Sequence, residues 1–179
     1  QGPARRRRID RSMTTSSLAF AEDDTLQVAR PARLPRAIPP RRLDEMDLDA
    51  WSGFFTDDCT YKVISFENHS EGLPLALIEC SGIGMVRDRV AAIRQTAVYE
   101  PRQLRHFVSG VRVDGVEGEV VAARANFLVA ESLSDREPQI AMVGRYLDRL
   151  VRVGTALRFR ERVCVVDNYR IRTSLVVPV

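Results

Sequence analysis

The sequence predicts an α+β fold in which helices pack on one face of a curved antiparallel sheet. Before Pro101, apolar residues recur at helical spacing in two segments. After Pro101, four long segments alternate apolar and polar residues, and short connections rich in turn-forming residues join them. Helices followed by consecutive hairpins are typical of α+β domains, and 179 residues of which 45% are hydrophobic can bury one core.

The first 42 residues have the composition of a disordered tail. They hold ten arginines against four acidic residues, a net charge of +6, whereas residues 43–179 hold 17 basic and 20 acidic residues, a net charge of −3. Repeated prolines block a continuous helix, and high charge with few large apolar groups favours disorder. We therefore expect an Arg/Pro-rich tail over 1–42, disordered or partly artefactual, and a compact domain over 43–179. Met13 is a plausible natural start, so residues 1–12 fit either an added segment or upstream sequence.

Charge and hydropathy exclude several classes of protein. The folded part is mildly acidic, so the arginine run at residues 5–8 is interpreted as tail and not as a nucleic-acid-binding arm. No uncharged apolar stretch is long enough to span a membrane, and no apolar segment follows the basic start as in a secretory signal. Cys59, Cys80 and Cys164 are widely spaced and odd in number, as expected for buried thiols in a reducing cytoplasm.

The first expected elements are a helix and a strand. Asp47 can cap a helix, whose apolar face would be formed by the aromatic residues at i, i+3 and i+4, namely Trp51, Phe54 and Phe55. Residues 59–66 alternate apolar and polar side chains, which predicts a strand with Tyr61 and Val63 on its buried face. The polar residues 68–72 are expected to form a loop, and residues 74–80 a second short strand.

The second helix is expected to begin at Gly82 and Gly84. Its buried face would consist of the apolar residues at i, i+4, i+7 and i+11, namely Val86, Val90, Ile93 and Ala97.

The four long strands are expected over residues 104–113, 119–131, 139–153 and 157–166, with turns at 114–118, 132–138 and 154–156. Residues 171–177 are expected to continue the last strand past a bend. Five arginines fall within these strands, at positions 145, 149, 158, 160 and 162. One face of the sheet must therefore be solvated or bonded to a partner.

The motifs of common cofactor and catalytic sites are absent from the sequence. The chain has two histidines, His69 and His106, and no Cys-x-His pair. A Rieske cluster needs two cysteines and two histidines, and a mononuclear iron site needs two further histidines and a carboxylate. We therefore predict no catalytic, cofactor-binding or metal site on this chain.

Three groups of polar residues are candidate sites. Asp57 and Asp58 beside Tyr61 could perform proton transfer, although two aspartates between a helix and a strand more often form a turn. The cluster that includes Asn68, His69 and Glu71 fits either a hydrogen-bonded loop or a subunit contact. Tyr99, Arg102, Arg105 and His106 flank the join of helix and sheet, where they could be structural groups or interface contacts.

Four collinear blocks resemble the β subunits of Rieske-type ring-hydroxylating oxygenases. They are Phe-Phe-Thr-Asp-Asp-Cys-Thr-Tyr-Lys-Val at 54–63, Asn-His-Ser-Glu-Gly-Leu-Pro at 68–74, the segment from Met85 to Ser109, and the segment from Gly144 through Arg162 to the ending Ser-Leu-Val-Val-Pro-Val. The second and third blocks are most similar to oxygenases that act on aromatic carboxylates such as terephthalate, salicylate, anthranilate or halobenzoate.

The resemblance implies a cone-shaped fold similar to nuclear transport factor 2, and a structural, non-catalytic role in aromatic catabolism. The partner would be an oxygenase α subunit that carries the Rieske 2Fe-2S cluster and the mononuclear non-haem iron. The subunits would form an α3β3 hexamer built on a β trimer, and a reductase would supply electrons. The interface candidates on this chain are Asn68, His69, Glu71, Tyr99, Arg102, Arg105 and His106.

One departure and one alternative stand beside this interpretation. The family usually has a longer first helix that ends in a stretch like Arg42-Leu43-Asp44-Glu45, and residues 14–41 show no amphipathic helix in that place. The alternative function is a stand-alone cone-fold isomerase or dehydratase with Asp58, Tyr61 and His106 as acid–base groups. That function requires a buried carboxylate, so it fails if Asp57 and Asp58 are both exposed to solvent.

Overall fold

The described part of the chain consists of a six-stranded sheet and four helices. The computed structural model describes residues 40–168 and 175–179. The strands are β1 (Phe55–Ser65), β2 (Ile78–Ser81), β3 (Arg102–Glu117), β4 (Val120–Leu133), β5 (Gln139–Val153) and β6 (Ala156–Val166). The helices are α1 (Pro40–Asp44), α2 (Leu48–Ser52), α3 (Phe66–Ser70) and α4 (Gly82–Gln95).

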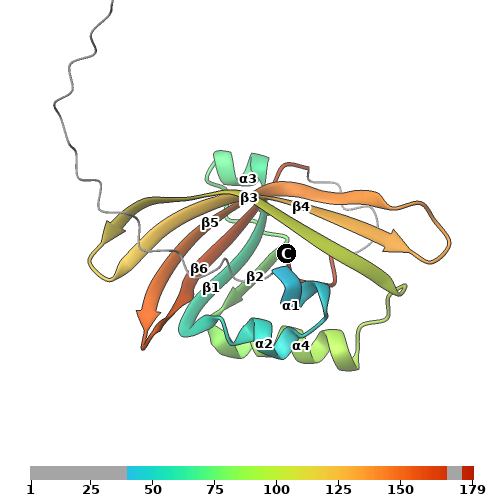
Figure 1. Ribbon diagram of the computed structural model, residues 1–179, viewed down its shortest axis with the longest axis horizontal. Helices are drawn as coiled ribbons and strands as arrows, with labels where there is room; N and C mark the ends of the chain where they lie inside the picture. Colours follow the sequence, from blue (N-terminus) through green and yellow to red (C-terminus); the bar gives the residue numbers. More distant parts are fainter. Residues whose placement is uncertain (1–39, 169–174) are drawn as a thin grey trace, which may run out of the picture. The chain divides into compact units, whose positions relative to one another are not determined.

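The helices and the sheet are arranged as the sequence predicts. Figure 1 shows a curved, unclosed sheet with α1, α2 and α4 on one side of it. Contacts between α4 and β1 and between α1 and β3 attach these helices to the sheet. The predicted α+β fold with helices on one face of a curved sheet is confirmed. The expected tail over 1–42 lies largely outside the described residues, and its boundary with the domain falls within α1.

The four long strands form the predicted antiparallel meander. β3 pairs with β4, β4 with β5, and β5 with β6, all antiparallel. Gly118 and Gly154 have φ values of +60° and +61° at two of the turns, a conformation that glycine adopts without strain. The first turn is shorter than expected, because β3 continues to Glu117 and pairs through most of the segment at 114–118.

The first strand pairs with the last, which the sequence did not predict. The order across the sheet is β2-β1-β6-β5-β4-β3, and β1 runs parallel to β6. The sheet is therefore mixed and not purely antiparallel. Hydrophobic alternation shows that a segment is a strand, but it does not identify the neighbour of that strand, because pairing between distant segments depends on the whole fold.

Irregularities in the strand pairing accompany the curvature of the sheet. The register of β3 against β4 shifts between Ser109 and Arg112, and the register of β4 against β5 shifts between Val129 and Ala130. Each such bulge bends the strand and increases its local twist. A further shift, between Arg149 and Leu150, lies opposite β6 and determines which side chains of that strand face the helices.

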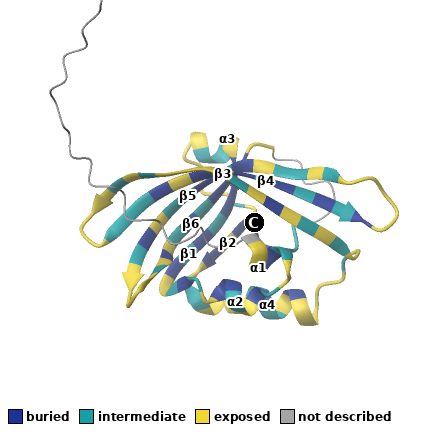
Figure 2. Ribbon diagram, viewed as in Figure 1, coloured by how far each residue is buried: buried dark blue, intermediate teal, exposed yellow. Residues whose placement is uncertain are grey.

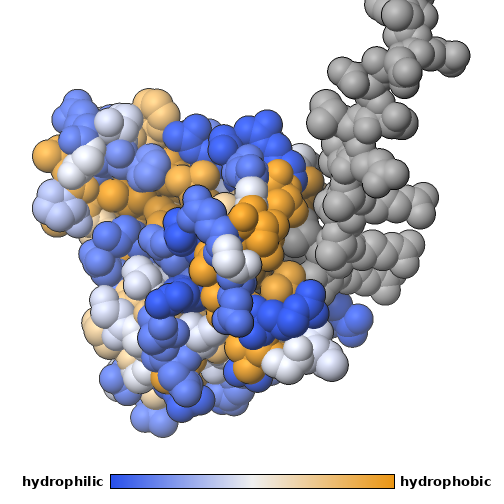
Figure 3. Space-filling model, turned by 90° about the vertical axis from the view of Figure 1, so that its left-hand side faces the viewer, coloured by the Kyte–Doolittle hydropathy of each residue, from blue (hydrophilic) through white to orange (hydrophobic). Residues whose placement is uncertain are grey.

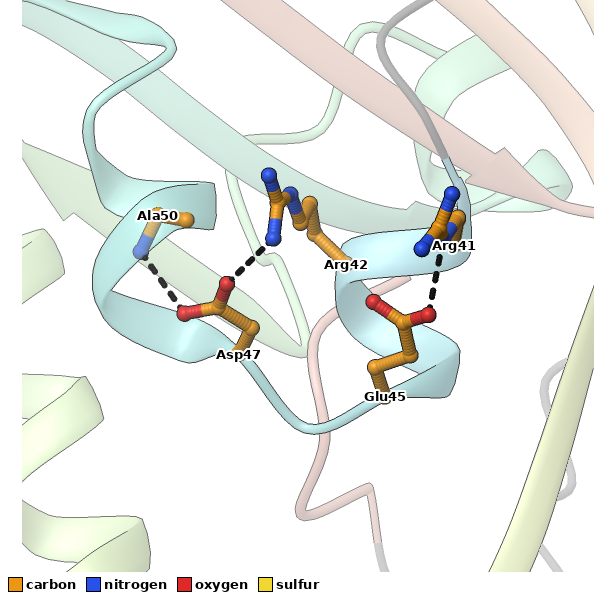
Figure 4. A network of polar contacts seen from close by, with 5 residues as sticks. All are labelled: Arg41, Arg42, Glu45, Asp47 and Ala50. Atoms are coloured by element: carbon orange, nitrogen blue, oxygen red, sulfur yellow. Dashed lines mark hydrogen bonds and ion pairs between the residues drawn. The ribbon is translucent and has the colours of Figure 1, made fainter.

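The first helix is shorter than expected. Asp47 caps it as predicted, because its carboxylate accepts a hydrogen bond from the Ala50 N–H at 3.3 Å (Figure 4). However, α2 ends at Ser52, and Phe55 already belongs to β1. The prediction that Phe54 and Phe55 lie on the helix is wrong. The Phe54 carbonyl accepts a hydrogen bond from the Phe159 N–H at 2.8 Å, so pairing with the sheet prevails over the helical spacing.

The segment between β1 and α4 also differs from the prediction. Part of the expected loop is the short helix α3, capped by Ser65, whose hydroxyl accepts from the Asn68 N–H at 3.3 Å. The second strand is only Ile78–Ser81, because the preceding residues form an irregular segment. The Asn68 side chain fixes that segment by donating to the Leu75 carbonyl at 2.7 Å.

The core lies between the sheet and α2 and α4. Val86, Val90 and Ile93 are buried on α4 as predicted, but the helix ends before Ala97, which is exposed. Trp51, Phe55, Tyr61 and Phe159 form an aromatic cluster with ring centroids 5.0–5.9 Å apart. Figure 2 shows the same pattern, with buried residues along the middle of the strands and exposed residues at the hairpin ends.

The last residues of the chain lie inside the fold. Residues 171–174 of the expected final strand lie outside the described residues, and residues 175–179 form no strand. Val177 and Val179 are buried, with exposed fractions of 4% and 0%. Figure 1 marks this end of the chain between the sheet and the helices.

Candidate functional site

The two aspartates considered for acid–base chemistry lie on the surface. Asp57 and Asp58 are exposed residues of β1, and Arg160 Nε lies 3.4 Å from Asp58 Oδ2. A hydrogen bond with Thr56 is the main cause that lowers the pKa of Asp58, with a further contribution from the charge of Arg160. A general acid at neutral pH needs the opposite, a buried carboxyl group whose pKa is raised. The alternative function as an isomerase or dehydratase fails on this point.

Tyr61 is a core residue and does not face the two aspartates. Its hydroxyl oxygen accepts a hydrogen bond from the Val179 N–H at 2.9 Å, and its ring meets the Trp51 ring edge-on at 5.3 Å. Complete burial raises the pKa of the phenol far above its usual value. This is the structural role that the spacing of the strand predicts.

His106 joins α1 to β3 in the interior. Its Nδ1 lies 2.7 Å from Asp44 Oδ1, which also accepts from the His106 main-chain N–H at 3.1 Å. Because the carboxylate is an acceptor, the ring proton belongs on Nδ1. Burial lowers the pKa of His106, although Asp44 opposes this by favouring the charged form. The side chain is 1% exposed, so His106 is buried within the chain.

The Arg102 side chain is also largely buried. Its Nη1 lies 2.8 Å from Glu131 Oε1, and the exposed fractions of the two side chains are 7% and 8%. The guanidinium carbon stands 5.7 Å from the centre of the Tyr99 ring. Arg102 lies opposite Leu133 and Glu131 lies opposite Leu104, so this diagonal pair links β3 and β4 at the end of the meander.

A second buried ion pair crosses β5 and β6. Arg162 donates to both carboxylate oxygens of Asp148, with both distances 2.9 Å. The guanidinium carbon lies 4.1 Å from the Tyr146 ring centre and 3.9 Å from that of Phe159. Burial disfavours the charged form, but Asp148 more than compensates and raises the pKa of Arg162. Burial also raises the pKa of the neighbouring Cys164 thiol to about 12.

Arg162 does not share the face, solvated or bonded to a partner, that the sequence predicts for the five strand arginines, because it lies on the buried face of the sheet. Leu150 pairs with Phe159, and Arg149 pairs with Glu161, so Arg160 is an extra residue in β6. The bulge moves Arg162 to the face that carries Phe159. A period-two pattern contains no signal for a bulge, and only the pairing with β5 reveals it.

The remaining interface candidates lie at or near the surface. Glu71 and Arg105 are exposed, and Asn68, His69 and Tyr99 are partly exposed. Next to Asn68, the irregular segment presents three exposed leucines, Leu73, Leu75 and Leu77, with exposed fractions of 47%, 74% and 43%. Exposed apolar groups held by a fixed backbone are typical of contact surfaces. Figure 3 shows one face of the molecule, where hydrophobic side chains gather in patches between hydrophilic ones.

Within residues 40–168 and 175–179, no three His, Cys, Asp or Glu side chains come close enough together to hold a metal ion. Cys59, Cys80 and Cys164 are free and buried. None of the helices that the structure describes combines the length and the hydropathy needed to cross a lipid bilayer.

Comparison with known sequences gives a consistent set of relatives. The family model described as "Ring hydroxylating beta subunit" matches residues 40–173. The chain is 32% identical over 137 residues to the small subunit of anthranilate 1,2-dioxygenase from Burkholderia cepacia, which covers 76% of this chain and 85% of that protein. It is 28% identical over 138 residues to the beta 1 subunit of the terephthalate 1,2-dioxygenase terminal oxygenase component from Comamonas sp, covering 77% and 90%.

Solved structures show the same architecture. The beta subunit of a putative aromatic-ring-hydroxylating dioxygenase from Novosphingobium aromaticivorans superposes with a TM-score of 0.70 at 37% identity, covering 78% of this chain and 88% of the other. The beta subunit of benzoate 1,2-dioxygenase from Burkholderia mallei gives a TM-score of 0.62 at 20% identity, covering 76% and 88%. A putative scytalone dehydratase from Novosphingobium aromaticivorans shares the fold at 19% identity, with a TM-score of 0.57 and coverage of 75% and 82%.

Proposed function

The chain belongs to the ring-hydroxylating β-subunit family, and from this we propose that it is the structural small subunit of a multicomponent dioxygenase that hydroxylates aromatic compounds. The observation that carries the proposal is the family match over residues 40–173, together with 32% identity to a dioxygenase small subunit. The protein is therefore part of an oxidoreductase complex, and the oxidation takes place on another subunit.

The proposed partner is a large α subunit that carries a Rieske 2Fe-2S cluster and a mononuclear non-haem iron. The composition of the small chain supports this division, because its two histidines cannot supply the ligands of both centres. A reductase would deliver electrons to the α subunit. The three unpaired thiols are consistent with a cytoplasmic location.

We further propose an aromatic carboxylate as the substrate and an α3β3 hexamer as the assembly. The proposed substrate class is supported by the names of two relatives, an anthranilate dioxygenase and a terephthalate dioxygenase, because anthranilate and terephthalate are both aromatic carboxylates. In the hexamer the small subunits would also contact one another as a trimer, in keeping with the closed symmetry of most oligomers. Residues 43–179 would form the assembling domain, preceded by the Arg/Pro-rich tail.

The proposed contact surface for the large subunit combines the partly polar end of α3 with the leucines beside it. Asn68 fixes the segment through its hydrogen bond to the Leu75 carbonyl, so Leu75 is presented without a large loss of backbone entropy on binding. His69 and Glu71 would supply polar contacts there, and Arg105, on β3 at the other edge of the sheet, would contribute to a separate contact. An obligate interface of about 2,000 Å² or more would cover such a surface.

The test is co-expression with a candidate large subunit, followed by mass determination in solution and an absorption spectrum. We expect both chains to elute together in equal numbers, with the colour of a Rieske cluster that the small chain lacks by itself. A small chain that always elutes alone would refute the proposal.

Matched variants test the contact surface separately from the assembly. Leu75→Asp introduces a charge on the proposed surface, whereas Val116→Asp introduces the same charge at the tip of the β3–β4 hairpin, where the side chain is also exposed, by 65%. We expect Leu75→Asp to weaken capture of the large subunit by roughly tenfold or more, since it buries an unpaired charge. Equal effects of the two changes would place the interface elsewhere.

A further inference from the structure

The space beneath the sheet is occupied by the chain itself. Residues 175–179 form no helix or strand, yet Val177 and Val179 are buried at 4% and 0% exposure. They lie among residues of β1, β6 and α4, elements that are far away in the sequence. Figure 1 shows this end of the chain between the sheet and the helices.

The fold holds this segment through its main chain. Arg89 Nη2 on α4 donates to the Leu175 and Val176 carbonyl oxygens, both at 2.9 Å. The Val179 N–H donates to the Tyr61 hydroxyl at 2.9 Å, and the Cys164 thiol approaches the main-chain oxygen of Val179 with Sγ at 3.6 Å. The surrounding groups therefore recognise acceptors and a donor and not a particular side chain, so the segment is bound in the way that a peptide ligand is bound.

The groups around residues 175–179 indicate which kind of ligand could bind in place of the segment. One guanidinium nitrogen of Arg89 faces two neutral carbonyl oxygens, a position that the two oxygens of one carboxylate could fill with a stronger, charge-assisted hydrogen bond. The walls are largely aromatic, because Tyr61, Tyr146 and Cys164 line the same face of neighbouring strands. The buried Arg162–Asp148 ion pair lies on that face as well. His106 is also buried beside the segment: its Nε2 makes no hydrogen bond of good geometry among the described residues, and although burial lowers the pKa of His106, the Pro178 main chain favours the charged ring and acts to raise that pKa.

We propose that residues 175–179 occupy an internal ligand site, and that this site binds a small aromatic carboxylate when the segment is displaced. The inference goes beyond the proposed role as a scaffold and does not depend on it, since every contact lies within one chain. In this site Arg89 would bind the carboxylate of the ligand, and the Tyr61 hydroxyl would form a hydrogen bond with a polar group at the edge of the ligand.

The direct test uses a chain that ends at residue 174, with benzoate as the probe. Trp51 is the single tryptophan and touches Tyr61, so its fluorescence reports occupancy. We expect the shortened chain to bind benzoate about tenfold more tightly than benzyl alcohol, the difference expected for a charged hydrogen bond. The peptide Leu-Val-Val-Pro-Val should compete, and the full chain should bind neither molecule. A folded shortened chain that binds neither benzoate nor the peptide would overturn the proposal.

A second test uses the full chain and does not require the shortened one to fold. Arg89→Met removes the main anchor of the segment, and Arg87→Met on the exposed side of α4 is the matched control. We expect labelling of Cys164 by N-ethylmaleimide, mapped by mass spectrometry, to become about tenfold faster in Arg89→Met alone, since local release exposes the thiol. Cys59 and Cys80 should label at unchanged rates. An unchanged labelling rate of Cys164, or an equal increase at all three thiols, would refute the proposal that residues 175–179 can leave the site while the rest of the fold stays intact.

Discussion

Replacing Arg162 by methionine should destabilise the protein strongly, because it leaves Asp148 as a lone charge in the interior. The two side chains are 9% and 10% exposed, and two hydrogen bonds of 2.9 Å join them. Breaking such a pair on one side costs about 3–5 kcal/mol. The lost contacts with the Tyr146 and Phe159 rings are included in that figure, since they disappear with the same group.

A surface pair in the same strand provides the control. Arg160 Nε lies 3.4 Å from Asp58 Oδ2, and these side chains are 55% and 65% exposed. Exposed pairs contribute about 0–1 kcal/mol, so Arg160→Met should change the free energy of unfolding by no more than that. The two methionine variants should therefore differ by about 2–5 kcal/mol.

Urea unfolding followed by Trp51 fluorescence measures both changes. A double variant, Arg162→Met with Asp148→Leu, removes the charges together and should recover most of the loss, because apolar residues of similar volume replace a buried pair well. If Arg162→Met costs no more than Arg160→Met, the pair is not buried as the structure indicates. If the double variant costs the sum of its parts, the unpaired charge is not the cause.

Three further results are expected. Gly144→Ala should cost about 3 kcal/mol in urea unfolding, because a Cβ there would meet the Phe127 ring at 2.8 Å and a main-chain carbonyl of β6. Burial lowers the pKa of His106, so the unfolded state takes up a proton first and stability should fall as the pH drops below about 6.5. His106→Gln should remove that dependence in a pH series, whereas His69→Gln should leave it. Asp47→Ala should lower the unfolding free energy by about 1 kcal/mol through loss of the α2 cap, and an unchanged value would contradict that role.

Local patterns were sufficient for the architecture and the family. Alternation over the four long strands and the helical spacing of Val86, Val90 and Ile93 predicted the meander and α4, because each pattern records which face of an element is buried. The capping role of Asp47 followed from the same local chemistry. The absence of cofactor ligands and the four family blocks then predicted a non-catalytic β subunit, which agrees with the relatives that the chain matches.

The tertiary structure decided everything that depends on contacts between distant residues. The parallel pairing of β1 with β6 and the bulge that turns Arg162 inward have no local signature. The same holds for the burial of His106 against Asp44 and for the placement of residues 175–179 beneath the sheet. The sequence determined which segments could be helices or strands, because propensity and periodicity act over a few residues. Which strands pair and which helices cover them was fixed only by the packing of the whole chain, because burial and hydrogen bonding at one element depend on all of its neighbours at once.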